Sequence, residues 1–117
     1  MIDGLKKILS DETPIDQVLA IGPIGMMQAV AEATRPWEIP TTVSMNPIMV
    51  DGIGMCGSCR VKVGDHILFA CVDGPDMDGH RVDFEELKTR QTRFREEEQH
   101  CLKKFREKFP PIGGEVR

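Results

Sequence analysis

Residues 51–71 read DGIGMCGSCRVKVGDHILFAC and contain three of the four cysteines of the 117-residue chain. Counted from Asp51, the spacing is D-x4-C-x2-C-x11-C. The plant-type [2Fe-2S] pattern is C-x4-C-x2-C followed by a more distant Cys, so Asp takes the place of the first Cys. The intervening glycines let the backbone take positive φ and approach a cluster closely. The pattern therefore predicts a [2Fe-2S] cluster with four ligands, Asp51, Cys56, Cys59 and Cys71.

Two other metal sites overlap this region. Structural zinc could use the three thiols with either His66 or His80, but zinc ribbons usually pair two C-x2-C knuckles and the chain has one. Calcium is a weaker alternative, because Gly stands at the first ligand position and a strand precedes the loop. Its ligand positions would be Gly74, Asp76, Asp78, Gly79 and Glu85. We favour the cluster, since clustered thiols in a reducing compartment indicate metal or redox chemistry.

Composition limits the partners. The net charge of -4, one Trp and no Tyr argue against nucleic acid, which favours basic and aromatic surfaces. No apolar run approaches the ~20 residues that span a bilayer, and the first residues lack the apolar core of a signal peptide. We therefore expect a cytoplasmic protein with neither nucleic acid nor membrane as a partner.

Upstream of the loop, helical and strand patterns alternate. Apolar spacing, short apolar runs and the Gly22-Pro23 punctuation define these segments. The expected elements are a helix over residues 2–9, a strand over 18–21, a helix over 23–34 and a strand over 39–45. This order is typical of a parallel α/β sheet.

Downstream, residues 61–63 and 66–69 form a predicted hairpin with a type II′ turn at Gly64. A polar loop is expected over residues 73–81. Asp83 and Glu86 form a capping box, and Val82 with Leu87 a hydrophobic staple, for a helix to about Phe109. Its narrow apolar stripe is expected to pack on its own domain, with contact to a partner subunit as the alternative. Cys101, on this stripe, is expected to be a free core thiol.

Four stretches resemble a known family. They are IGPIGMM at residues 21–27, SMNPIMVDGIGMCGSCRV at 44–61, FACVDGP at 69–75 and GHRVDF at 79–84. The chain resembles ferredoxin-reductase-like electron-transfer subunits: those of dihydroorotate dehydrogenase, the small subunit of NADH-dependent ferredoxin–NADP oxidoreductase (sulfide dehydrogenase), and hydrogenase γ subunits. Dihydroorotate dehydrogenase members carry Cys where Asp51 stands, so the ferredoxin–NADP oxidoreductase branch is the more similar one.

The resemblance implies a subunit with an FAD-binding barrel, an NAD(P)-binding α/β domain and a cluster lobe. In this chain, residues 1–45 correspond to the end of the NAD(P)-binding domain, 46–82 to the [2Fe-2S] lobe and 83–117 to a C-terminal amphipathic helix and tail. The family's Arg-x-Tyr-Ser motif and Gly-rich pyrophosphate loop have no counterpart here. We therefore expect the chain alone to lack the FAD site and not to be catalytic.

The resemblance also implies roles for particular residues. Gly22 and Pro23 resemble the family's Cys-Gly-Pro segment beside the nicotinamide, with Ile in place of the Cys. One iron would be held by Asp51 and Cys56, and the other by Cys59 and Cys71. Electrons from NAD(P)H would pass through FAD and the cluster to a larger iron-sulfur flavoprotein subunit. Self-association of the chain is a further expectation.

Overall fold

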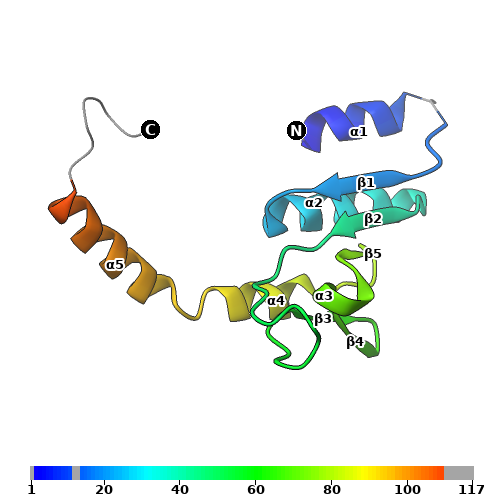
Figure 1. Cartoon of the computed structure of the whole chain (residues 1–117). Coiled ribbons are helices and arrows are strands. Elements are labelled where there is room, and N and C mark those ends of the chain that lie inside the picture. The colour runs from blue at the N-terminus through cyan, green and yellow to red at the C-terminus, as the bar shows by residue number, and fades with distance from the viewer. Residues whose placement is uncertain (1, 12–13, 110–117) are drawn as a thin grey trace.

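Two small β-sheets with flanking helices organise the chain (Figure 1). The computed structural model describes residues 2–11 and 14–109. The first sheet has the strand order β1-β2-β5, and the second is the hairpin β3-β4. This mixture of helices and strands confirms the expected α/β class. Within the described ranges, no helix combines the length and the apolar character needed to cross a bilayer.

The first sheet starts from the parallel pair that the sequence predicts. The elements of this half are α1 (Ile2–Ser10), β1 (Val18–Ile21), α2 (Ile24–Thr34), the 3-10 turn η1 (Arg35–Trp37) and β2 (Thr41–Ser44). β1 and β2 are parallel, with Val18 opposite Thr41. All four predicted elements are present, and their bounds agree within two residues.

A third strand joins this sheet from a segment predicted to be a polar loop. β5 (Asp76–Asp78) runs antiparallel to β2, with Met77 opposite Val43. The expectation of a loop over residues 73–81 is therefore wrong for residues 76–78. Met77 and Val43 are both buried, but aspartate is depleted in strands, so the local signal points to a turn. The free edge of β2 supplies the backbone partners that the local sequence does not contain.

The second sheet is the predicted hairpin. β3 (Arg60–Val63) pairs antiparallel with β4 (His66–Phe69). In the turn between them Gly64 has a φ of 58°, and Asp65 is not among the residues with positive φ, as a type II′ turn requires. One helical turn, α3 (Ala70–Asp73), follows β4, although the sequence pattern predicts no helix there.

The C-terminal region contains two helices where the sequence predicts one. α4 spans Phe84–Gln91 and α5 spans Arg95–Lys108. At the break, the Thr92 hydroxyl donates to the Thr89 carbonyl at 3.0 Å, a local bond that competes with a continuous helix. α4 buries two side chains in the core, whereas α5 buries none, so no packing holds α5 in line with α4.

The start of α4 shows half of the predicted capping box. Asp83 Oδ1 accepts a hydrogen bond from the Glu86 N–H at 3.0 Å. The Glu86 carboxylate does not return to Asp83; it pairs with Arg90 at 3.0 Å. The Asp83 N–H donates instead to the carbonyl of Lys62 in β3 at 2.9 Å. A tertiary contact has therefore replaced the second local bond.

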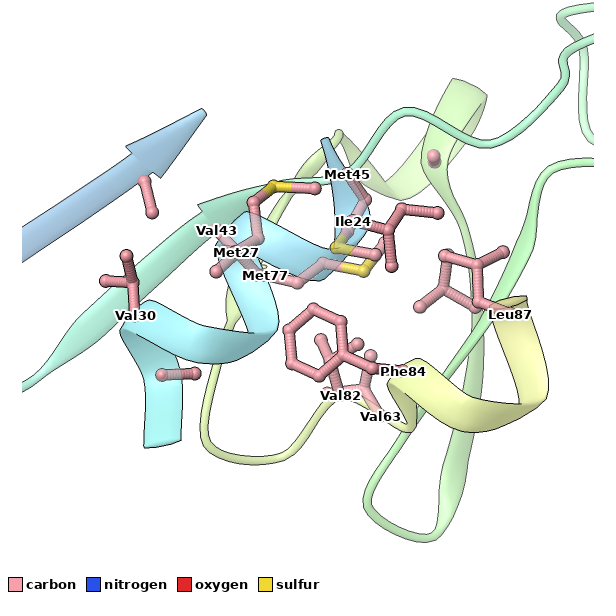
Figure 2. Packing of buried hydrophobic residues seen from close by; sticks show 14 of the residues in the cluster. Ile24, Met27, Val30, Val43, Met45, Val63, Met77, Val82, Phe84 and Leu87 are labelled. Carbon is pink, nitrogen blue, oxygen red and sulfur yellow. The ribbon is translucent and has the colours of Figure 1, made fainter. Parts of the chain in front are cut away.

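One cluster of buried side chains lies between the sheets and the helices (Figure 2). Its members on or beside α2, β2, β5, β3 and α4 are Ile24, Met27, Val30, Val43, Met45, Val63, Met77, Val82, Phe84 and Leu87. The cluster also contains Cys59 and Ala70, which lie at the open end of the hairpin. The base of the predicted metal-binding loop is therefore part of the core.

The predicted apolar stripe of the C-terminal region packs on its own domain only along α4. Phe84 and Leu87 are buried. The exposed members are Phe94, Leu102, Phe105 and Phe109. Cys101, expected as a core thiol, is exposed as well. Both expectations are wrong for α5, because the helix break lets α5 project away from the sheets (Figure 1).

Candidate metal centre

The glycine-rich loop bends as the sequence predicts. Gly52, Gly54 and Gly57 have φ values of 73°, 81° and 67°, a region that favours glycine. A Cβ atom on Gly54 would lie 2.6 Å from Cγ2 of Val72 in α3. Glycine at this position therefore allows the loop to approach the helical turn that carries Cys71.

The Asp51 carboxylate lies at the centre of the loop. Its Oδ1 accepts from the Ile53 N–H at 3.0 Å, and its Oδ2 accepts from the N–H groups of Met55 at 3.2 Å and Cys56 at 2.7 Å. These bonds lower the pKa of Asp51, with the bond from Ile53 the largest cause. The loop thus folds around an ionised carboxylate and holds it beside Cys56.

The Cys56 thiol is exposed and favours ionisation. Its Sγ lies 3.1 Å from the Ser58 hydroxyl oxygen. Hydrogen bonding from Ser58, first through its hydroxyl and then through its backbone N–H, lowers the pKa of Cys56. Because the thiolate is the form that binds metal, these bonds prepare Cys56 for ligation.

Cys59 and Cys71 form a second pair at the open end of the hairpin. Cys59 is 1% exposed and precedes β3, while Cys71 lies in α3 after β4. A hydrogen bond from the Ala70 N–H to the Cys59 carbonyl, at 3.2 Å, ties the two segments together. The pKa of Cys71 is raised, first by its hydrogen bond with the Cys59 thiol and then by burial, while the Gly54 N–H acts in the opposite sense.

The four predicted ligands therefore lie as two neighbouring pairs. Asp51 adjoins Cys56, and Cys59 adjoins Cys71. In the described residues, no three His, Cys, Asp or Glu side chains gather as ligands of a single ion. Adjacent thiolates repel each other, and a metal cation relieves that repulsion. Three sulfurs and a carboxylate in two pairs fit a group with two irons, each of which takes two protein ligands.

The ligands of the alternative metal sites lie elsewhere. His80 Nε2 is 3.0 Å from the Thr34 hydroxyl oxygen, which engages that ring nitrogen. His66 begins β4 at the turn, three residues along the hairpin from the Arg60–Phe69 pair beside the thiols, about 10 Å at the usual strand rise. The predicted calcium positions 76 and 78 are in strand β5, which pairs with β2.

Gly22 and Pro23 lie where β1 ends and α2 begins. Pro23 is the N-cap of α2, and the Gly22 carbonyl accepts from Asn46 Nδ2 at 3.4 Å. The carboxyl end of a parallel strand is the usual edge for ligands in α/β sheets. The structure thus connects the predicted nucleotide-side segment to the start of the metal-binding loop.

Sequence reasoning missed three residues that support the loop. Ser58 bonds the Cys56 thiol, and its position within C-x2-C was an available signal. Arg90 of α4 donates to the Ser58 carbonyl at 3.1 Å, and Glu86 pairs with Arg90. No local pattern predicts the roles of Arg90 and Glu86, because they are about 30 residues from the loop and meet it only through the fold.

The comparisons with known proteins identify an iron-sulfur domain in this region of the chain. Residues 46–83 match the family described as the iron-sulfur cluster binding domain of dihydroorotate dehydrogenase B. The electron-transfer subunit homolog of dihydroorotate dehydrogenase B from Thermotoga maritima is 43% identical over 109 residues, which cover 87% of this chain and 39% of the relative. An uncharacterized protein of Clostridium beijerinckii is 50% identical over 97 residues, which cover 82% of this chain and 33% of the relative.

The chain is also similar to a solved structure of the NADH-dependent reduced ferredoxin–NADP oxidoreductase. It superimposes with a TM-score of 0.78 at 43% identity, over 89% of this chain and 38% of the matched chain. The chain spans about a third to two fifths of the length of these relatives. The chain is therefore similar to part of the ferredoxin-reductase-like electron-transfer subunits, and the four predicted ligands, Asp51, Cys56, Cys59 and Cys71, all lie within the matched iron-sulfur domain.

Proposed function

We propose that this chain carries a [2Fe-2S] cluster and relays single electrons between an FAD and NAD(P)H module and a larger flavoprotein subunit. Asp51 and Cys56 would hold one iron, and Cys59 and Cys71 the other. When bound, such a cluster accepts and releases one electron at a time. The observation that carries the proposal is that Asp51 and Cys56 lie together on a loop lined by glycines, while Cys59 and Cys71 lie together at the open end of the hairpin.

Asp51 is the unusual member of the set. Its carboxylate carries the same charge as a thiolate but is harder and less covalent. Its bonds from the N–H groups of Ile53, Met55 and Cys56 also give it a purely structural alternative, in which it only shapes the loop. The two roles differ in what a Cys replacement does, because a thiolate ligates iron but accepts N–H bonds weakly.

The surface around the loop supports a subunit contact. Six apolar side chains before the loop, within it and on α3 are 46–82% exposed: Ile48, Met49, Val50, Ile53, Met55 and Val72. We call these six residues the apolar collar. Asp51 is the only charged residue from 46 to 59. Exposed apolar side chains gathered in one segment are typical of a protein–protein contact, so we propose that the collar docks on the larger subunit.

The FAD and NAD(P) sites belong in this proposal to the intact subunit. Gly22 and Pro23 at the end of β1 would border the nicotinamide, as the parallel β1–β2 pair supports. The exposed stripe of α5 offers a second contact surface, for the larger subunit or for another copy of the chain.

Anaerobic reconstitution with ferrous iron and sulfide tests the cluster. The expected product is a brown protein with about two irons and two sulfides per chain and the EPR signal of a reduced [2Fe-2S] centre. Cys59→Ser should abolish uptake, whereas Cys101→Ser, a matched change on exposed α5, should not. A colourless chain that binds zinc and no iron, with the wild-type sequence, would refute the proposal.

Two Asp51 variants test the fourth ligand. Asp51→Ala should lower cluster retention, and Asp51→Cys should retain the cluster with a changed EPR spectrum. Identical spectra for both variants and the wild type would remove Asp51 from the ligand set and leave it the structural role.

The collar is tested by co-purification with the larger subunit. Met55→Lys should leave cluster uptake unchanged and abolish co-purification. Ile67→Lys is the matched control, because Ile67 is 61% exposed on β4, outside the collar. Equal loss with both variants would contradict docking through the collar.

A further inference from the structure

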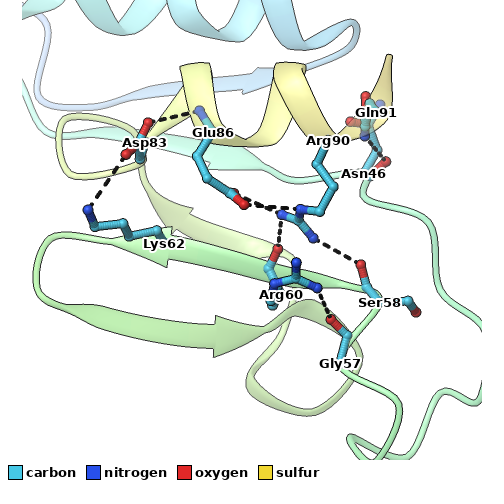
Figure 3. Close-up of polar contacts among 9 residues, drawn as sticks. All are labelled: Asn46, Gly57, Ser58, Arg60, Lys62, Asp83, Glu86, Arg90 and Gln91. Atoms are coloured by element: carbon cyan, nitrogen blue, oxygen red, sulfur yellow. Dashed lines mark hydrogen bonds and ion pairs between the residues drawn. The ribbon is translucent and has the colours of Figure 1, made fainter. Parts of the chain in front are cut away.

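The side chain of Arg90 connects α4 to the backbone on both sides of Cys59 (Figure 3). Its Nη1 donates to the Ser58 carbonyl at 3.1 Å, and its Nη2 donates to the Arg60 carbonyl at 2.6 Å. The Arg90 side chain is only 14% exposed. One guanidinium therefore holds the residues before and after the buried thiol.

The position of Arg90 follows from the hydrogen-bond pattern of β3. Because the Ala70 N–H donates to the Cys59 carbonyl, the next pair, Arg60 and Phe69, is a non-hydrogen-bonded pair of the antiparallel ladder. The Arg60 carbonyl therefore points away from β4, toward α4. Two residues on, the Lys62 carbonyl points the same way and accepts from the Asp83 N–H.

Backbone pairing along this edge of β3 ends where α4 begins. Beyond Asp83, the Glu86 N–H donates to the Asp83 carboxylate and the Leu87 N–H to the Asp83 carbonyl, and the Arg60 carbonyl takes its bond from a side chain. Arg90, two turns into α4, supplies side-chain donors instead. Gln91 Nε2 donates to the Asn46 carbonyl at 3.4 Å, so the end of α4 also contacts the segment that enters the loop.

Glu86 fixes the plane of the guanidinium. Its carboxylate accepts from Arg90 Nε at 3.2 Å and from Nη2 at 3.0 Å, a bidentate pair one helical turn apart. Such a pair has geometric specificity as well as charge, because the planar guanidinium matches the carboxylate. With one edge of Arg90 held by Glu86, the opposite donors face the two carbonyls.

We propose that Arg90, oriented by Glu86, is a positioning residue for the iron-sulfur site: it holds the Cys59 backbone in place and sets the local charge felt by the cluster. The effect of Arg90 on the charge felt by the cluster, the redox part, rests on the proposed function. Its effect on the Cys59 backbone, the positional part, can be measured on the metal-free chain. Partners that orient metal ligands typically contribute 10–100-fold to metal affinity.

Three substitutions separate position from charge. Arg90→Gln removes both carbonyl contacts and leaves the Glu86 charge uncompensated beside the loop. Arg90→Lys keeps the charge but loses the planar fork that reaches two carbonyls. Arg93→Gln is the matched control, because it removes the same charge from an exposed position just past α4.

Hydrogen exchange on the metal-free 117-residue chain measures whether Arg90 holds the backbone around Cys59 in place. Amides of residues 57–60 should exchange faster in both Arg90 variants than in the wild type, while amides of β1 and β2 stay protected. Arg93→Gln should match the wild type. Unchanged protection at residues 57–60 in both Arg90 variants would overturn the positioning role. If Arg90→Gln also loses protection in β1 and β2, its fold is disturbed more widely, and the result for Arg90→Lys decides.

Iron release and the reduction potential of the reconstituted chain measure the effect of Arg90 on the cluster. Iron transfer to a chelator should be roughly 10–100-fold faster in Arg90→Gln and Arg90→Lys. The reduction potential should fall in Arg90→Gln, because a nearby uncompensated carboxylate disfavours the added electron, and should change less in Arg90→Lys. Wild-type values in both Arg90 variants would overturn the inference alone, whereas failure of the wild type to bind iron would overturn the proposed function and the redox part with it.

Discussion

Replacing Gly54 with Ala tests whether the metal-binding loop is held against α3. Gly54 has a φ of 81°, and an added Cβ would lie 2.6 Å from Cγ2 of Val72. Gly52 has a similar φ of 73°, but among the described residues no heavy atom lies within 4 Å of its added Cβ. Alanine at either position would therefore strain the backbone to a similar extent, but only alanine at position 54 would also overlap with Val72.

The magnitudes follow from this difference. A left-handed conformation costs a residue with a Cβ roughly 1–2 kcal/mol, so Gly52→Ala should lower the free energy of unfolding by about that amount. Overpacking adds about 1–3 kcal/mol, and valine cannot easily rotate away because its branched side chain is stiff at χ1. Gly54→Ala should therefore cost about 2–5 kcal/mol, and Val72→Ala in the same chain should remove the steric part.

The assay is urea unfolding of the four proteins, with cluster half-life after reconstitution as a second measure. We expect the double variant Gly54→Ala/Val72→Ala to match Gly52→Ala, and Gly54→Ala alone to be the least stable and to lose its cluster fastest. Equal stability of Gly54→Ala and Gly52→Ala would refute the reasoning, because it would mean that the loop moves freely away from α3.

Three further predictions concern α4 and α5. Asp83→Ala should lower the free energy of unfolding by about 1 kcal/mol, since it removes the N-cap bond of α4, and a denaturant titration would reveal an unchanged value if that bond contributes nothing. The pKa of Glu85 is lowered, first by its bond from Gln28, so Gln28→Ala should raise it in an NMR titration. The stability linked to that lowered pKa is present above the pKa of the unfolded chain and is lost as the pH falls through the folded pKa, so this acid-dependent loss should be smaller in Gln28→Ala. Leu87→Ala should cost about 2–5 kcal/mol because Leu87 is 1% exposed, whereas Leu102→Ala on exposed α5 should stay within about 0.5 kcal/mol; a comparable loss at Leu102 would show that α5 packs on the domain.

The apolar stripe shows why part of the fold was predictable and part was not. Helical spacing identifies the apolar face of residues 84–109 correctly, but spacing alone does not say what that face contacts. Phe84 and Leu87 reach the core because the Asp83 cap starts α4 against β3. Beyond Thr92 the helix restarts with no core beside it, so Phe105 remains exposed.

β5 illustrates the opposite error. Asp76 and Asp78 favour a turn locally, yet Met77 between them is buried opposite Val43 of β2. A three-residue strand has too little pattern of its own to be recognised. Its existence depends on the free edge of β2, which lies more than 30 residues earlier in the chain.

The sequence by itself determined the helix and strand order of the first half, the hairpin with its glycine turn, and the choice of Asp51 and three cysteines as predicted ligands, because spacing, glycine and proline act over short distances. Only the tertiary structure decided that Arg90, paired with Glu86, contacts the backbone on both sides of Cys59 and that α5 is left exposed. The physical reason is that hydrogen bonds and packing between distant segments depend on which strand edges and helix faces remain unused after local structure has formed.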